Sequence, residues 1–264
     1  MGTLLLAGCT HSAAPSGAPA AAVTKTGPRA GTPNVTPTTT PTPTGPRLVR
    51  EVVRIGTSAG GTPLMAVHVG DPSRPAVLVV GCIHGDEAAG IPVAGQLAAL
   101  TARQAAPADL WVVVDLNPDG VNRGTRTNSR GVDLNRNFAV GWRPAAHDTH
   151  YSGPIAASEP ETRALAALLE RTRPAVGIWF HQALATIDDS EGPPGAEAAL
   201  ARALGLPETA LTDYPGSAIG YENSLVAHSG FAVELPAGPL SGPAADRLAR
   251  TILAVASAPD PRSP

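Results

Sequence analysis

The chain has 264 residues and a formal net charge of −3 without a basic stripe, which argues against a nucleic acid as its partner. No segment approaches the roughly 18 consecutive apolar residues that a membrane-spanning helix needs. The two cysteines, Cys9 and Cys82, offer no disulfide framework, because Cys9 belongs to an apolar leader.

The leader ends in Leu4-Leu-Leu-Ala-Gly-Cys9, which resembles the lipobox of bacterial lipoproteins. The resemblance implies cleavage before Cys9, lipidation of its thiol, and an extracytoplasmic protein that is anchored to the membrane through lipid alone, or secreted. However, the apolar run is short and no Lys or Arg precedes it, whereas secretory signals begin with positive charge. Either the true start lies upstream or residues 1–9 are not a signal.

Residues 10–47 consist almost entirely of Ala, Pro, Thr, Gly and Ser. Such a segment cannot bury enough apolar area to fold, so we expect an extended, disordered tether. We assign the folded domain to residues 48–258 and a short tail to residues 259–264.

Six apolar segments predict β-strands, with helices between them. The strands are expected at residues 49–55, 64–69, 77–80, 110–115, 176–180 and 231–234. Helices are expected from Ala88, after Ser158, and over residues 196–204 and 244–255. Ser158 and Glu161 form the pattern of a capping box, with Pro160 in the first turn. The alternation predicts a single α/β domain with a mixed, mostly parallel sheet and helices on both faces.

The segment Val80-Gly-Cys-Ile-His-Gly-Asp-Glu87 places His84 and Glu87 where a buried strand gives way to a helix. Open α/β sheets place their sites at such strand ends. At this spacing the two side chains can converge on one metal ion, and zinc accepts nitrogen and oxygen ligands. The structural alternative is that His84 caps the turn and that Glu87 begins the helix, where the helix dipole favours an acidic side chain. Cys82 is a candidate ligand or nucleophile, but its more ordinary role is that of a small buried hydrophobe.

Two further strand ends carry polar side chains. His181 follows the apolar segment Ala175-Val-Gly-Ile-Trp-Phe, and Glu234 lies inside the apolar run Gly230–Pro236. His181 is a candidate third ligand, although a histidine after a strand is more often structural. A buried carboxylate is costly without a partner, so Glu234 needs a metal, a metal-bound water or an arginine beside it.

A polar, cationic loop runs from Arg126 to Phe138 between apolar anchors. Arginine binds carboxylates through two parallel hydrogen bonds, so Arg126 could polarise a carbonyl, and Asn135 with Arg136 could hold a carboxylate. The alternative is a solvated loop of scattered charge. We expect Asp119 and Asp133 to shape turns.

In their order along the chain, these motifs resemble the zinc carboxypeptidase family. They are His84-x-x-Glu87, Asn117-Pro-Asp-Gly, Gly131-Val-Asp-Leu-Asn-Arg-Asn-Phe138, Ser158-Glu-Pro-Glu-Thr162, His181 and Glu234. Within the family the chain is most similar to the bacterial murein peptide amidases, which cleave the bond between γ-D-glutamate and meso-diaminopimelate. The small size, the segment Phe180–Asp189 and Tyr214-Pro-Gly-Ser217 indicate this subgroup.

The resemblance implies one zinc ion, bound by His84, Glu87 and His181. It implies that Glu234 is the general base, and later the acid, for attack by a metal-activated water. It also implies that Arg126 stabilises the oxyanion.

The resemblance further implies that Asn135 and Arg136 bind the terminal carboxylate of a peptide or muropeptide substrate. Larger family members use a mobile tyrosine between the last ligand and the base. Tyr214 and Tyr221 both lie in that interval, and Tyr221 is the first candidate for the role. The pair at residues 188–189 is expected near the substrate.

Three other functions remain open: a carboxypeptidase that acts on ordinary peptides, a deacylase of N-acyl amino acids, and a peptidoglycan-peptide binding module without activity. A binding module should have lost a ligand or the base, whereas all four residues are present here.

Overall fold

The computed structural model describes residues 49–102, 106, 108–190 and 192–258. The predicted lipobox with Cys9, the tether and the tail lie outside the described residues and stay predictions. Within the described residues, no helix combines the length and the apolar character that crossing a bilayer requires.

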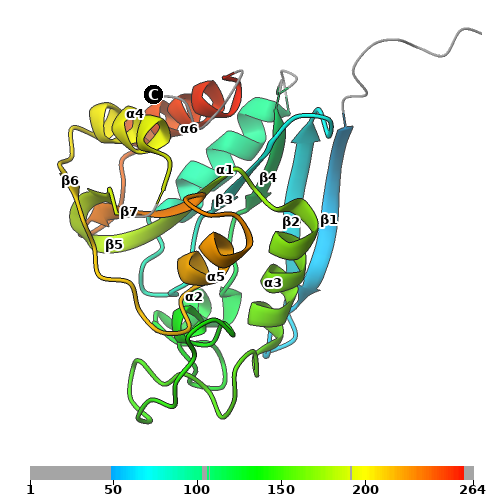
Figure 1. The fold of residues 1–264 in the computed structure, drawn as a ribbon, viewed down its shortest axis with the longest axis vertical. Helices are drawn as coiled ribbons and strands as arrows, with labels where there is room; N and C mark the ends of the chain where they lie inside the picture. Colours follow the sequence, from blue (N-terminus) through cyan, green and yellow to red (C-terminus); the bar gives the residue numbers. More distant parts are fainter. Residues whose placement is uncertain (1–48, 103–105, 107, 191, 259–264) are drawn as a thin grey trace, which may run out of the picture. The chain divides into compact units, whose positions relative to one another are not determined.

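A mixed sheet forms the centre of the described domain, and in Figure 1 its strands run side by side between two groups of helices. Its strands are β1 (Val49–Thr57), β2 (Pro63–Gly70), β3 (Ala76–Val80), β4 (Asp109–Val113), β5 (Val176–Asp188), β6 (Glu208–Thr209) and β7 (Gly230–Pro236). The spatial order is β1-β2-β4-β3-β5-β6, and β7 pairs with β5. The pairings among β1, β2 and β4 are antiparallel, and those among β3, β4, β5, β6 and β7 are parallel.

Helices cover both faces of the sheet (Figure 1). One layer contains α1 (Gly90–Thr101), α4 (Pro194–Leu204) and α6 (Gly242–Ala256), and the other contains α3 (Pro160–Thr172) and α5 (Ala218–Leu225). Strand β5 shows how its period-two pattern supplies both cores: Ile178 and Phe180 join the first, whereas Trp179 joins the second. The predicted fold class, a single α/β domain with a mixed, mostly parallel sheet, is therefore confirmed.

The last helix illustrates how sequence specifies an element. Leu248, Ile252 and Ala256 recur every four residues and are buried in the first core. The Ser241 hydroxyl accepts a hydrogen bond from the Ala244 N–H, which caps the start of α6. An amphipathic stripe and a capping residue thus define α6 locally.

Three sequence-based expectations were wrong in detail. The short helix α2 (Pro118–Arg123) was not among the expected helices, and Asn117 caps it because its side chain accepts a hydrogen bond from the Gly120 N–H. The capping box does not form: α3 begins at Pro160 with Glu159 at the N-cap, and Glu161 instead accepts a hydrogen bond from the Ala59 N–H. Packing against a distant loop thus replaced the local cap.

The third difference concerns β5, which continues through His181 to Asp188 instead of ending at Phe180. The segment after His181, Gln-Ala-Leu-Ala-Thr-Ile-Asp188, hid this extension, because its polar and apolar residues do not alternate regularly. The pairing of β5 with β7 also shifts register between Ala183 and Thr186. Such irregularities bend a strand and re-aim its side chains, and they are common next to active sites.

Candidate active site

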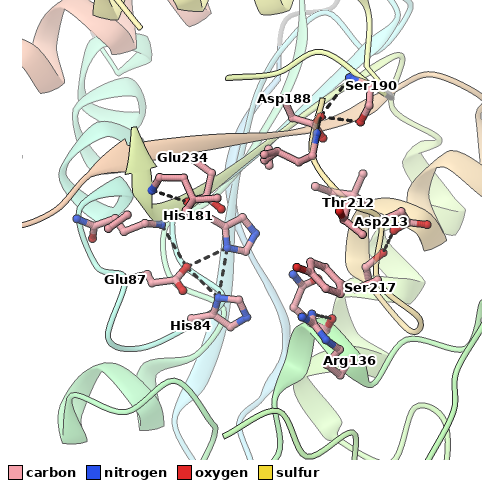
Figure 2. Close-up of a pocket in the computed structure, with 18 of the residues that line it drawn as sticks. His84, Glu87, Arg136, His181, Asp188, Ser190, Thr212, Asp213, Ser217 and Glu234 are labelled. Atoms are coloured by element: carbon pink, nitrogen blue, oxygen red, sulfur yellow. Dashed lines mark hydrogen bonds and ion pairs between the residues drawn. The ribbon is translucent and has the colours of Figure 1, made fainter. Parts of the chain in front are cut away.

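The structure brings His84, Glu87 and His181 together at the carboxyl edge of the sheet (Figure 2). His84 and Glu87 lie in the turn between β3 and α1, and His181 lies on β5. Since β3 and β5 are parallel neighbours, their carboxyl ends meet at this edge. The turn also packs closely on α2: a Cβ at Gly85 would lie 2.0 Å from the Gly120 carbonyl carbon, so only glycine fits there.

The donor atoms of these three residues fit a zinc ion. Glu87 Oε2 lies 2.9 Å from His84 Nδ1 and 3.0 Å from His181 Nδ1, and the two nitrogens are 3.3 Å apart. A tetrahedral zinc ion with bonds of about 2.0–2.1 Å keeps its ligand atoms roughly 3.3 Å from one another. A zinc ion held by these two nitrogens and one oxygen would keep one position for water, as catalytic zinc sites do.

Asp133 holds His84 from the side opposite Glu87. Its Oδ1 lies 3.1 Å from His84 Nε2, and its Oδ2 accepts a hydrogen bond from Arg126 Nε at 2.8 Å. Burial opposes ionisation, but the hydrogen bond from His84 and the charges of Arg126 and Arg136 outweigh it and hold the pKa of Asp133 below its usual range. An ionised carboxylate can only accept, so Nε2 carries the proton and Nδ1 keeps its lone pair for a metal.

Asp133 has a larger role in the structure than the expected shaping of a turn. The expected turn is present, because its Oδ1 also accepts from the Asn135 N–H and caps the short 3₁₀ helix η1 (Leu134–Arg136). The contacts with His84 and Arg126 were missed. An acid in a polar loop carries no sequence signal of such a role, since the contacts depend on how the loop packs.

Arg126 connects the metal triad with this buried acid. Its Nη1 lies 3.0 Å from Glu87 Oε1 while its Nε donates to Asp133. The guanidinium is thus fixed at the edge of the triad, and Arg126 lines the cavity.

Glu234 lies beside His181 because β7 pairs with β5 in a register that sets these two residues opposite each other (Figure 2). Its neighbours Val233 and Leu235 are buried, whereas Glu234 is half-buried and lines the cavity. Its Oε2 accepts a hydrogen bond from the Leu184 N–H at 3.3 Å. In the described part of the chain Glu234 forms no ion pair with an arginine, so the salt-bridge alternative has no support.

Asn135 and Arg136 form one wall of the same cavity. Asn135 Oδ1 accepts from the Ala218 N–H at the start of α5, which ties η1 to that helix. The Arg136 guanidinium lies 4.1 Å from the centroid of the Tyr214 ring. Burial lowers the pKa of Arg136 and the charge of Asp133 opposes this, so its guanidinium is partly desolvated.

Of the two candidate tyrosines, the structure places Tyr214 at the cavity and Tyr221 away from it. Tyr221 lies on α5, and its hydroxyl donates to Glu170 of α3 at 2.6 Å. This placement does not support the preference for Tyr221 as a substrate-binding residue. Tyr214, half exposed and stacked on Arg136, is the tyrosine within reach of a substrate.

The cavity has a volume of about 450 Å³, with the triad and Glu234 at one end. The other end carries hydroxyl and carboxyl groups from Ser190, Thr212 and Asp213 (Figure 2). Asp188 also lines the cavity, but it is buried and its Oδ1 accepts from the Ser190 N–H, the Ser190 hydroxyl and the Leu211 N–H. Asp188 therefore orders this wall, whereas Asp213 is exposed. Sequence reasoning missed Thr212 and Asp213, whose only signal was their position just before Tyr214.

Cys82 is fully buried, and its thiol donates to the His84 carbonyl oxygen at 3.1 Å. Burial raises the pKa of this thiol above its usual range, which disfavours the thiolate form. The expectation of a small buried hydrophobe is confirmed.

Comparisons with known proteins agree with this geometry. The sequence model of the family described as zinc carboxypeptidase matches residues 44–187, more than half of the chain. Murein peptide amidase A from Escherichia coli K12 is 35% identical over 177 residues, which are 61% of this chain and 72% of the relative. The crystal structure of a murein-tripeptide amidase from Escherichia coli O157 matches with a TM-score of 0.63 at 30% identity, over 78% of this chain and 91% of that one.

A more distant structure shares the fold alone. Carboxypeptidase A from Helicoverpa armigera has a TM-score of 0.66 at 19% identity, over 79% of this chain and 68% of the other. Family membership thus rests on the sequence matches, and the fold agrees with it. The chain belongs to the zinc carboxypeptidase family, whose members depend on zinc, and it is an enzyme of the metallopeptidase and amidase type.

Proposed function

We propose that this enzyme is a zinc-dependent hydrolase of amide bonds in cell-wall peptides, specific for the bond between γ-D-glutamate and meso-diaminopimelate. The observation that carries the proposal is the meeting of His84, Glu87 and His181 with Glu234 in one cavity whose far end is polar. The relatives named murein peptide amidase A support the choice of substrate.

The residues of the triad would hold the zinc ion. When bound, zinc acts as a Lewis acid and activates a water for attack on the carbonyl. Glu234 takes a proton from the attacking water and then gives it to the leaving amine. One carboxylate beside the ion is enough for both proton transfers. Arg126, fixed by Asp133 and Glu87, places a guanidinium where negative charge develops on the carbonyl oxygen.

The leaving group, diaminopimelate, carries one carboxylate next to the scissile bond and an ammonium with a second carboxylate at the end of its side chain. Asn135 and Arg136 suit the first carboxylate, because an arginine fork binds carboxylates through parallel hydrogen bonds. Asp213 suits the distant ammonium, and the Thr212 hydroxyl suits the second carboxylate. A large apolar side chain would offer Thr212 and Asp213 no polar partner.

A second candidate is a carboxypeptidase that removes C-terminal lysine or arginine from ordinary peptides. Asp213 favours it, because one carboxylate at the far end of the cavity would pair equally with a lysine ammonium. The two functions differ in whether the distant carboxylate of the substrate matters.

The test is the release of diaminopimelate from L-alanyl-γ-D-glutamyl-meso-diaminopimelate, measured by mass spectrometry with and without a chelator. We expect release that stops on chelation and returns with zinc, and slower release of lysine from the lysine-ended peptide. Release that ignores chelation would contradict the zinc mechanism. Faster release of lysine would favour the carboxypeptidase, and cleavage of an N-acyl amino acid alone would favour the deacylase.

The proposal includes an extracytoplasmic location, because cell-wall peptides lie outside the cytoplasm. Its support is the sequence alone: the lipobox ending at Cys9 and the Pro/Thr-rich tether at residues 10–47. We expect the full-length protein to fractionate with membranes and Cys9→Ala to lose that association. Equal fractionation of both proteins would contradict a lipid anchor.

A further inference from the structure

A second cavity, of about 660 Å³, adjoins the first at Arg126, which lines both. The segment after α2 and the loop at residues 147–151 form its walls. Arg130 also lines this cavity, and about half of its side chain is exposed. Neither the metal triad nor Glu234 lines this cavity, so it does not take part in the chemical step.

The position of this cavity identifies the part of the substrate that it can receive. In the proposed function Arg136 and Asn135 hold the carboxylate of the leaving group, and Arg126 holds the scissile carbonyl. The acyl group must then leave the triad on the side of the carbonyl away from Arg136. The second cavity lies against Arg126 and Asp86, the neighbour of the ligand Glu87, and Arg136 does not line it, so it is the candidate for this side.

The loop that carries Arg130 is held by the buried side chain of Asn128. Asn128 Oδ1 accepts from the Arg130 N–H at 2.9 Å and from the Val132 N–H at 3.1 Å. Its Nδ2 donates to Glu159 at 2.8 Å, which anchors the loop to the start of α3. The backbone at Arg130 is therefore fixed before a ligand arrives, although its guanidinium stays at the surface, 3.6 Å from Glu159.

We propose that Arg130 binds the free α-carboxylate of the γ-linked glutamyl residue on the acyl side of the scissile bond. The inference rests on the proposed function and gives it a second determinant of specificity. A γ-linkage leaves the α-carboxylate free, and standard bond lengths place it about 5 Å from the scissile carbonyl carbon. An α-linked peptide has a backbone amide there and offers no such charge.

The same cavity carries two carboxylates, Asp86 and Asp148. The free murein tripeptide has an N-terminal alanine ammonium beyond its glutamyl carboxylate. The cavity thus carries charged groups of both signs, as the acyl group does.

The experiment compares two substrates that differ at one group: the tripeptide with a free glutamyl α-carboxylate, and the same peptide with an α-carboxamide. A charge-assisted hydrogen bond at a half-exposed site corresponds to about a tenfold preference for the free acid in kcat/KM. We expect Arg130→Gln to reduce this preference towards one, chiefly through KM. Arg143→Gln, which removes an equal charge from the exposed neighbouring loop outside both cavities, should keep the preference.

A binding measurement separates this inference from the proposed function. Glu234→Gln should bind the free-acid tripeptide more tightly than the carboxamide, and adding Arg130→Gln should remove the difference. If the wild-type enzyme releases no diaminopimelate but this difference is seen, the proposed function fails and the subsite stands. If diaminopimelate is released yet Arg130→Gln affects both peptides equally, or neither, the subsite is overturned.

Discussion

The two ends of the active-site cavity are built in different ways. At the catalytic end, His181 and Glu234 lie on paired strands, and His84 and Glu87 lie in the turn that follows a third. At the other end, Thr212 and Asp213 lie on an exposed segment between β6 and α5. The first set is positioned by backbone hydrogen bonds of the sheet and the second by a loop, so the chemistry is fixed while the choice of substrate can vary.

The largest expected effect is at the catalytic end, in the metal site. His84→Ala removes one of three donors, and we expect loss of both bound zinc and activity, measured by metal analysis and by diaminopimelate release. His228→Asn is the control, because His228 is exposed, has a positive φ that asparagine tolerates, and lies outside the cavity. Unchanged zinc content in His84→Ala would contradict its assignment as a ligand.

Glu234→Gln separates the base from the ligands. We expect it to keep zinc and to lower kcat by about a hundredfold to ten-thousandfold, the usual range for a general acid–base group. KM should change little, because the positions of Asn135 and Arg136 do not depend on Glu234. Near wild-type turnover in this variant would exclude Glu234 as the base.

Asp213→Asn tests the end of the cavity that the segment between β6 and α5 forms. It should change the selectivity for the substrate rather than the rate of the chemical step. We expect kcat/KM for the diaminopimelate peptide to fall about tenfold, through loss of one charged contact, with zinc content unchanged. Asp189→Asn is the matched control, since Asp189 is exposed nearby but does not line the cavity. Equal losses in the two variants would indicate a general effect of charge instead of a contact.

The smallest expected effect concerns the stability of the folded protein. Glu222 of α5 is fully buried and accepts a hydrogen bond from Trp179 Nε1 at 2.6 Å. Burial raises its pKa to about 8, although hydrogen bonds from Trp179 and Ser229 oppose the shift. The folded protein therefore keeps this proton while the unfolded chain releases it above its ordinary pKa of 4.5.

It follows that Glu222 contributes stability below about pH 4.5, and that this contribution is lost as the pH rises towards 8. In Glu222→Gln the decline in melting temperature between pH 5 and pH 8 should be shallower than in the wild type. The exposed Glu208→Gln should decline like the wild type. Parallel curves for Glu222→Gln and the wild type would show that the carboxyl is already ionised in the folded protein.

The sequence predicted the catalytic end better than the loop end, for a physical reason. Parallel strands gather their carboxyl ends at one edge, so polar residues at the ends of apolar runs predict that His84, His181 and Glu234 meet. The roles of these residues in catalysis stay predictions. No comparable rule applied to Asp133, whose contacts arise from the burial of a loop.

The tyrosines show the same limit. Tyr214 and Tyr221 lie seven residues apart in one short segment, and the start of α5 at Ala218 decides that Tyr221 packs toward α3. Short helices such as α5 have little periodicity from which to locate a boundary. The sequence therefore indicated a tyrosine in the interval but not which one.

The pairing of His181 with Glu234 across β5 and β7 has a consequence for how this enzyme can change. Side chains alternate between the two faces of a sheet, so adding or deleting one residue in β7 would turn Glu234 from the cavity into the apolar layer beneath α1 and α6. Substitutions can accumulate in that strand, whereas a change in its length cannot. The loop from β6 to α5 has no such restriction, and new substrate preferences would arise there first.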